Sequence, residues 1–318
     1  MAGRAATAAG ATRADGGRID AAALMRMRTL ELRARAVVEG FLSGLHRSPY
    51  HGFSAEFSEY RQYAVGDDLR YLDWRLLARS DRYYVKRFED ETNLACHLLV
   101  DLSRSMSFGS LGYAKADYAR TLAATLATFL SKQRDATGLM TFDETIGEAL
   151  PARFRPGHLH RLLLTLERAE GGRATDLMGP LERVAATVRR RGLVVLISDL
   201  LTPLDGLSQS LGALRAAGHD VLVLRTLDPA EIEFPFDRPV TIRDRESGRE
   251  MSVDGATAAA GYHARFTEHA AGLSELTSAI GVDLTTLRTD EPLDRALFDL
   301  LAARRRASPA GRVAGAGR

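Results

Sequence analysis

Carboxylate and hydroxyl side chains follow two apolar runs of the sequence and form its clearest chemical pattern. Asp101, Ser103 and Ser105 are spaced two apart directly after the run 94–100, and Asp199 comes shortly after a second such run. Oxygen ligands of this kind suit a hard cation such as Mg²⁺, which prefers octahedral geometry. So few protein ligands would leave one position open, and an outside carboxylate is the group that matches an open position on a hard cation.

The elements that must position these residues alternate between strand and helix. The runs 94–100 and 193–197 have the length and composition of strands buried on both faces. Alternation with helices predicts an α/β fold with a mostly parallel sheet, whose site lies at the carboxyl ends of the strands. The other expected strands are 137–142, 145–150, 219–224 and 282–287, the expected helices are 19–46, 112–132, 158–169, 177–190, 204–217, 256–280 and 293–303, and a hairpin is expected at 239–253.

Each candidate residue also has a purely structural explanation. Ser105 or Ser107 could cap the helix that follows, and Thr175 or Asp176 could cap the helix expected from residue 177. Asp199 could be a capping or turn residue after its strand. Each of these explanations is the commoner one when a residue is taken alone. The order of the motif along the chain, directly after the first buried strand, favours a shared role as metal ligands.

Composition limits the classes of function. The 318 residues include 43 Lys and Arg and 41 Asp and Glu, a net charge of +2, which does not favour a general binder of nucleic acid or of membrane surfaces. A lone cysteine, Cys96, can form neither an internal disulfide nor a cysteine metal site. No apolar run approaches the ~20 residues of a membrane span, and no secretory signal is visible, so we expect a cytoplasmic protein.

Changes of texture along the chain predict four parts. Residues 1–18 read as a disordered tail and 304–318 as a basic flexible tail. Residues 19–93 hold a helix and a small β module that is rich in aromatic residues, including the only tryptophan, Trp74. Residues 94–303 form the α/β domain. The aromatic module either packs against that domain or presents a partner-binding surface.

The spacing Asp101-x-Ser103-x-Ser105, followed by Thr175 and Asp199, resembles the metal-ion-dependent adhesion site of the von Willebrand factor A fold. The resemblance implies a Rossmann-like sheet of that type. It also implies that Ser103 and Ser105 ligate Mg²⁺ or Mn²⁺ directly. Thr175 would ligate directly or through water, and Asp101 and Asp199 mostly through water.

Upstream segments resemble the signature of the family called domain of unknown function 58, in which such a block precedes an adhesion-type domain. Members of that family look like bacterial accessory proteins of MoxR-type AAA+ ATPases. The resemblance therefore implies a non-enzymatic, metal-dependent protein-interaction module whose partner is such an ATPase or its client protein. The matching segments are Gly52-Phe53-Ser54-Ala55-Glu56-Phe57, Tyr60-Arg61-Gln62-Tyr63, Gly66-Asp67-Asp68, Arg70-Tyr71-Leu72-Asp73-Trp74-Arg75, Ala78-Arg79, Asp228-Pro229, Glu231 and Thr289-Asp290-Glu291-Pro292.

Two other classes of function are possible alternatives to a protein-interaction module: an enzyme and a nucleic-acid binder. A hydrolase or phosphotransferase could use a metal at Asp101 and Asp199, but the sequence lacks a Gly-x-Ser-x-Gly elbow and a phosphate-binding loop. We therefore expect no catalytic residues. A nucleic-acid binder could use the arginines at 189–191 and 304–306, but no aromatic residues are interleaved with them for base stacking.

Overall fold

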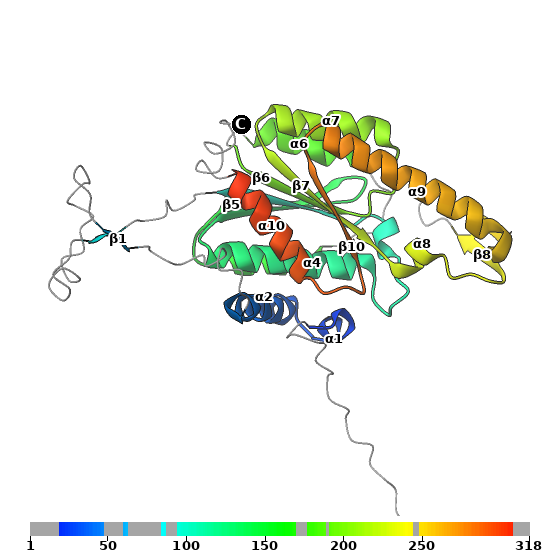
Figure 1. Ribbon diagram of the computed structural model, residues 1–318, viewed down its shortest axis with the longest axis horizontal. Coiled ribbons are helices and arrows are strands. Elements are labelled where there is room, and N and C mark those ends of the chain that lie inside the picture. The colour runs from blue at the N-terminus through cyan, green and yellow to red at the C-terminus, as the bar shows by residue number, and fades with distance from the viewer. Residues whose placement is uncertain are drawn as a thin grey trace, which may run out of the picture.

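One six-stranded sheet forms the centre of the molecule (Figure 1). The computed structural model describes residues 19–47, 60–62, 84–86, 94–169, 177–188, 191–243 and 248–307. The sheet has the order β10–β7–β6–β3–β4–β5, and neighbours pair in parallel except β5, which is antiparallel to β4. The expected α/β class with a mostly parallel sheet is confirmed. Its strands are β3 (Ala95–Asp101), β4 (Ala136–Phe142), β5 (Ile146–Arg153), β6 (Leu193–Ser198), β7 (Asp220–Leu227) and β10 (Asp283–Arg288).

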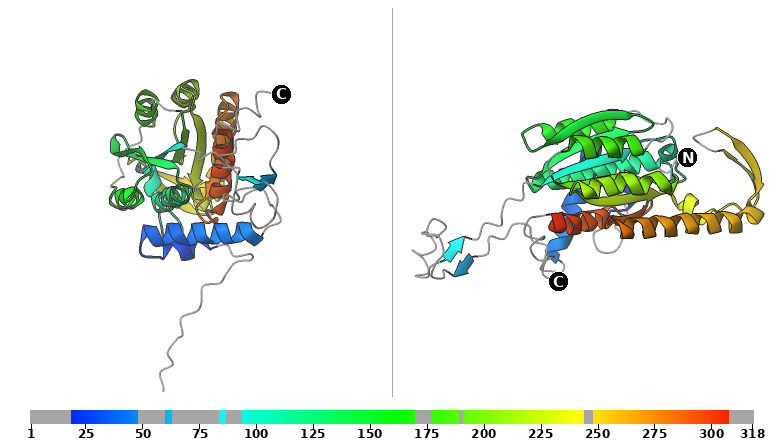
Figure 2. Two further views of the ribbon diagram at one scale, coloured as in Figure 1. Left: turned by 90° about the vertical axis from the view of Figure 1, so that its left-hand side faces the viewer. Right: turned by 90° about the horizontal axis from the view of Figure 1, so that it is seen from above.

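Helices cover both faces of the sheet, which gives three layers (Figure 2). On one face lie α4 (Lys115–Lys132), α5 (His158–Arg168) and α10 (Asp294–Ala307). On the other lie α6 (Met178–Thr187), α7 (Leu204–Ala216) and α9 (Gly255–Ala279). Within the described residues, no helix is both long and apolar enough to cross a membrane.

The central strands are apolar on both faces because each face meets a helical layer. In β3, Leu98 and Val100 belong to the core under α4, whereas Leu99 belongs to the core under α6 and α7. In β6, Val195 belongs to the core under α4, and Val194 belongs to the core under α6 and α7. Burial of each such side chain contributes about 1.5–3 kcal/mol, so the sheet is held from both sides.

The chain changes its direction of travel across the sheet at β3. From β3 it continues to β4 on one side, whereas β6, β7 and β10 are added on the other side. In open α/β sheets, ligands bind outside the carboxyl ends of the strands at such a switch point. Asp101 ends β3 and Asp199 follows β6, so the candidate residues lie at this point.

The N-terminal segment forms two helices, α1 (Ala21–Met25) and α2 (Leu30–Arg47). The expectation of one continuous helix over 19–46 is therefore wrong, because the chain leaves the helical conformation between residues 25 and 30. The Arg33 guanidinium donates hydrogen bonds to the carbonyl of Met25 at 2.7 Å and to that of Met27 at 2.9 Å. These carbonyls accept from a side chain, and the chain turns between the two helices.

Helix α2 packs on α4, which is part of the helical layer that covers one face of the sheet. Phe41 of α2 meets Phe129 of α4 edge to face, with ring centroids 6.0 Å apart. Ala34, Val38 and Phe41 belong to the same apolar core as the α4 side of β3. The N-terminal helix is thus a further layer outside α4 (Figure 1).

Two small two-stranded sheets lie outside the main sheet. β1 (Tyr60–Gln62) pairs antiparallel with β2 (Tyr84–Lys86), and both strands fall within the small β module expected in residues 19–93. Trp74 and most of the expected aromatic module lie outside the described residues. β8 (Pro239–Arg243) pairs with β9 (Glu250–Asp254), which confirms the hairpin expected at 239–253.

Candidate metal and partner-binding site

Two tight loops bring the candidate residues together at the carboxyl ends of β3 and β6. After β3 the chain enters a short 3₁₀ helix, η2 (Ser105–Ser107), and does not begin α4 until Lys115. The expected capping role of Ser105 or Ser107 is therefore not realised: α4 is capped by the Asp117 carboxylate, which accepts from the Ala114 amide at 3.1 Å.

The loop after β6 contains a residue in the left-handed region. Leu200 has a φ of 52°, which is uncommon for a branched side chain. Its side chain is buried, and its amide donates to the Ser198 hydroxyl at 3.1 Å. These contacts hold the loop in its conformation, in which Asp199 Oδ1 accepts from the Leu201 amide at 3.2 Å. Backbone conformations of this uncommon kind cluster at functional sites.

Asp101 is a fully buried carboxylate with a hydrogen bond to each oxygen. The Ser103 amide donates to Oδ1 at 2.9 Å, and the Ser198 hydroxyl donates to Oδ2 at 2.6 Å. Burial, and secondly the negative charge of Asp199, raise the pKa of Asp101 to about 6 even though these hydrogen bonds act in the opposite direction. Asp101 thereby ties the two loops together.

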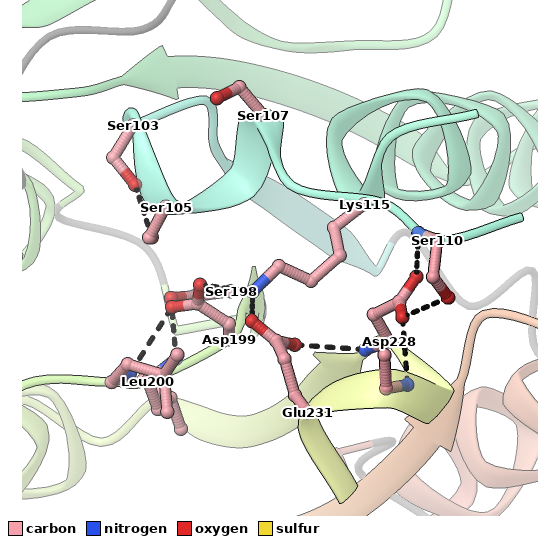
Figure 3. A network of polar contacts seen from close by, with 12 residues as sticks. Ser103, Ser105, Ser107, Ser110, Lys115, Ser198, Asp199, Leu200, Asp228 and Glu231 are labelled. Atoms are coloured by element: carbon pink, nitrogen blue, oxygen red, sulfur yellow. Dashed lines mark hydrogen bonds and ion pairs between the residues drawn. The ribbon is translucent and has the colours of Figure 1, made fainter. Parts of the chain in front are cut away.

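The two serine hydroxyls point at each other across η2. Ser103 Oγ and Ser105 Oγ are 3.2 Å apart (Figure 3). Two oxygens bound at right angles to one Mg²⁺, each at about 2.1 Å, lie about 3 Å apart, so this separation is the one that adjacent ligands of the ion would have. Ser107 is different, because its hydroxyl donates to the Arg104 carbonyl at 2.6 Å and faces away from the pair.

Asp199 is neutralised by a buried lysine. Lys115, at the start of α4, extends towards the β6 loop and α8 (Pro229–Glu233) (Figure 3). Its ammonium nitrogen lies 2.8 Å from Asp199 Oδ2 and 2.5 Å from Glu231 Oε1. Burial favours a lower pKa for Lys115, but the two carboxylates outweigh it and raise the pKa above its ordinary value. Lys115 is therefore a charged partner of both acids.

A second cation supports the same loop from β7. Arg225 is buried, and its Nε donates to the backbone carbonyl of Asp199 at 3.1 Å. Its guanidinium carbon lies 5.5 Å from the centre of the Phe266 ring on α9, a cation–π contact. Arg225 thus holds the Asp199 backbone in place.

The segment after η2 is fastened to α8 by one carboxylate. Asp228 accepts hydrogen bonds from the amide and hydroxyl of Ser110, at 2.9 and 2.5 Å, and from the amide of Ala230 at 2.9 Å. The last of these bonds caps α8. In addition, the Asp228 amide donates a hydrogen bond to the Glu231 carboxylate at 3.0 Å. One side chain therefore fixes both the helix start and the loop that follows the serines.

A groove of about 1110 Å³ opens beside the serine pair. Its walls come from the η2 loop, α8, the β8 strand and the start of α9, and they combine apolar and aromatic side chains with the cations Arg104 and Arg243. The residues that line it are Arg104, Ser105, Ser107, Phe108, Leu201, Ala230, Glu231, Phe234, Phe236, Val240, Thr241, Ile242, Arg243, Gly248 and Tyr262.

The fit of these residues to a divalent ion can be judged from the oxygens present. Asp101, Ser103 and Ser105 lie together after β3, and the Ser198 hydroxyl bonds Asp101 to the β6 loop. Asp199 lies in that second loop, where its two oxygens contact Lys115 and the Leu201 amide. Thr175 lies outside the described residues. Within the described part of the chain, no three His, Cys, Asp or Glu side chains are grouped to hold a metal. The donor set is instead two hydroxyls beside acids, which fits a weakly held hard cation that keeps several waters.

Sequence reasoning missed the cations of this site. Lys115 stands at the edge of an Ala- and Leu-rich helix and Arg225 within the apolar strand β7. A single charge embedded in an apolar element is the signal that could have indicated them, because such a charge needs a buried partner. Which acid each one meets depends on the fold.

Relatives of known sequence and structure were compared with the chain. It is 34% identical over 290 residues to the uncharacterized proteins Mb1516 of Mycobacterium bovis and Rv1480 of Mycobacterium tuberculosis, covering 90% of this chain and 90% of each relative.

Among solved structures, an aerotolerance-related membrane protein from Bacteroides fragilis, with multiple mutations to serines, aligns with a TM-score of 0.46 at 15% identity, covering 67% of this chain and 99% of that one. The conserved hypothetical protein BatB from Bacteroides thetaiotaomicron aligns with a TM-score of 0.44 at 16% identity, with the same coverage.

The family comparison covers both the small upstream hairpin and the site. The family model described as "Protein of unknown function DUF58" matches residues 59–272, a span that includes Asp101, Ser103, Ser105 and Asp199. Together with relatives that are 34% identical over 90% of the chain, this match shows that the chain belongs to the DUF58 family.

Proposed function

We propose that this protein is a non-enzymatic interaction module that binds a partner's carboxylate through a divalent ion held beside the groove. Ser103 and Ser105 would hold Mg²⁺ or Mn²⁺ directly, and Asp101 and Asp199 would do so mostly through water. When bound, the ion supplies a hard, positively charged position that accepts a carboxylate oxygen.

The observation that carries this proposal is the arrangement of the two serines. Their hydroxyl oxygens are 3.2 Å apart at the switch point of a parallel sheet, above a buried carboxylate. The two hydroxyls hydrogen-bond to each other, whereas the Ser107 hydroxyl bonds to the backbone, so the pair places two oxygens side by side without using the main chain. The arrangement also supports our assignment of a von Willebrand factor A-like fold with an adhesion-type metal site.

The groove supports a protein as the partner. Ser105 lines it together with the exposed cation Arg104 and the half-buried Phe108. Aromatic anchors with cations at the rim are typical of protein interfaces. A segment carrying an acidic residue and an apolar neighbour would place the carboxylate at the ion and the apolar group among the aromatic side chains.

The class of partner that we propose rests on the family resemblance. We propose that a MoxR-type AAA+ ATPase, or a client of that ATPase, supplies the carboxylate. Purified ATPase from the same genome provides the test. Immobilised wild-type protein should retain it in Mg²⁺ and release it in EDTA, and Ser103→Ala should not retain it in either buffer.

Ser107→Ala is the matched control, because it removes a hydroxyl from the same loop that faces away from the serine pair. Because Ser107 also lines the groove, the readout is metal dependence: this variant should retain the ATPase in Mg²⁺ and release it in EDTA, as the wild type does. Retention that is equal in EDTA and in Mg²⁺, or equal in Ser103→Ala and in wild type, would contradict a metal-bridged interface.

The alternative is a hydrolase or phosphotransferase that uses Asp101 and Asp199. Both oxygens of Asp101 already accept hydrogen bonds, and Asp199 Oδ2 is paired with Lys115, so neither carboxylate is poised as a nucleophile. We therefore favour the interaction role. Turnover of a phosphate ester by the purified protein, lost in Asp101→Ala, would reverse this preference.

A further inference from the structure

We infer that Lys115 is a tethered cation that occupies the negative field of Asp199 and Glu231 and thereby weakens the neighbouring site's hold on a divalent ion. The inference rests on the proposed metal site and deepens it, because it names the residue that sets how tightly the ion binds.

The position of Lys115 is explained by its charge, because apolar packing alone would not favour a buried lysine. Its side chain is 0% exposed, although lysine is almost never fully buried unless it is paired. Asp199, at 3% side-chain exposure, and Glu231, at 15%, lie within ion-pair distance of its ammonium group. The three residues come from α4, the β6 loop and α8, so the fold brings them together from separate elements.

Lys115 and a bound ion would compete for the negative charge of the same carboxylate, Asp199. Asp199 Oδ2 contacts the Lys115 ammonium, while Oδ1 accepts from the Leu201 amide at 3.2 Å. Asp199 is also the carboxylate whose charge acts on Asp101, so it lies within electrostatic reach of the serine loop. A positive charge already paired with Asp199 repels a second cation and reduces the negative charge available to it.

A purely structural ion pair predicts something different. Removing one partner of a buried pair leaves the other charge uncompensated, which destabilises the protein whether or not metal is present. A tethered cation that a divalent ion can replace predicts tighter metal binding after its removal. It also predicts that the metal restores part of the lost stability.

Calorimetric titration of Mg²⁺ and of Mn²⁺ into Lys115→Met separates these roles. Affinity should rise by about tenfold or more over the wild type, because one unit charge close to a divalent ion is removed from a poorly solvated site. Lys115→Arg keeps the charge and should stay within about threefold of wild type. Lys132→Met removes a lysine from the far end of α4 and should leave affinity unchanged.

Thermal unfolding supplies the second readout. Lys115→Met should melt at a lower temperature than wild type in EDTA and should gain more from saturating Mg²⁺ than wild type does, since tighter binding gives a larger shift. If that variant does not fold, Glu231→Gln and the double variant Lys115→Met/Glu231→Gln provide the same comparison with one acid fewer. The lysine removal should tighten binding about tenfold in that background as well.

The outcomes separate this inference from the proposed site. Equal or weaker affinity in Lys115→Met, with wild-type binding that is lost in Ser103→Ala, would overturn the role of the lysine and leave the metal site standing. Absence of Mg²⁺ and Mn²⁺ binding in wild type and in the lysine variants would overturn both. Tightening that Ser103→Ala abolishes would support both.

Discussion

A buried negative charge is the main energetic burden of the site at the scale of single residues. Asp101 has hydrogen bonds to both oxygens, yet burial and Asp199 still raise its pKa to about 6. The folded protein therefore binds the Asp101 proton up to about pH 6, whereas an unfolded chain releases it near pH 3.8. Stability from this group is complete below about pH 4 and is lost as the pH rises through 6.

Replacing this carboxylate by an amide should stabilise the metal-free protein. Asp101→Asn removes the buried charge, so at pH 7.5 and in EDTA the free energy of unfolding should rise by roughly 1–3 kcal/mol, a gain that shrinks towards pH 4. Urea titrations at both pH values measure the change. A loss of stability at pH 7.5 would show that the charge helps to hold the loops together without metal.

The residues of the site differ in how far the sequence could predict them. Asp101, Ser103, Ser105 and Asp199 stand next to apolar strands, and the rule that parallel strands place their carboxyl ends together predicted that the two loops would be neighbours, as the bond from Ser198 to Asp101 shows. Lys115 is fourteen positions after Asp101 along the chain, and only the packing of α4 against β6 and α8 reveals its partners. Local patterns do not encode such tertiary pairs.

At the scale of elements, one short connection determines the shape of the groove. Asp228 joins the segment after η2 to α8 by accepting from the amide and hydroxyl of Ser110, and it caps α8 at the same time. Loop and helix both line the groove. The position of one wall therefore depends on the other.

Asp228→Ala should be clearly destabilising for this reason. Loss of the cap and of both Ser110 bonds should lower the free energy of unfolding by about 2–3 kcal/mol, because three hydrogen bonds to the buried Asp228 carboxylate are lost. Asp254→Ala is the control: Asp254 precedes α9 at an exposed position and makes no side-chain bond to the helix backbone. Urea unfolding of both variants should show a loss of under about 1 kcal/mol for the control; equal losses would contradict the tether.

Elements with two apolar faces were the most predictable. The strands at β3, β6 and β7 coincide with the expected runs to within a few residues, because burial on both sides leaves a continuous apolar signature. The first helix was less predictable. Its apolar spacing continues across residues 26–29, and the interruption there depends on the Arg33 bonds to two carbonyls, which apolar periodicity does not record.

At the scale of the whole molecule, the sheet is stabilised by two apolar cores, one on each face. Ser103 and Ser105 belong to neither core. One core lies under α2, α4, α5 and α10, and the other under α6, α7 and α9. The fold should therefore persist without metal. It should be sensitive to acid through His97 on β3, because burial, and secondly the charge of His219, lower the pKa of His97 to about 4.

His97→Asn should reduce the loss of stability in acid. Between about pH 6.5 and pH 4 the unfolded chain binds a proton at this position and the folded protein does not, so wild-type stability falls as the pH falls, by about 2–3 kcal/mol from this group. Urea unfolding at pH 7 and pH 4 should show a smaller difference in the variant, with exposed His160→Asn unchanged from wild type. An identical pH dependence in His97→Asn would rule out this source of acid sensitivity.

The central claim is that the serine pair beside Asp101 holds a divalent cation. Calorimetric titration of Mn²⁺ into wild type, Ser103→Ala and Ser107→Ala at pH 7.5 tests it most directly. One weakly held ion per chain should bind to wild type and to Ser107→Ala, and binding to Ser103→Ala should be lost or weakened at least about tenfold. Equal binding by all three proteins, or by none of them, would contradict the claim.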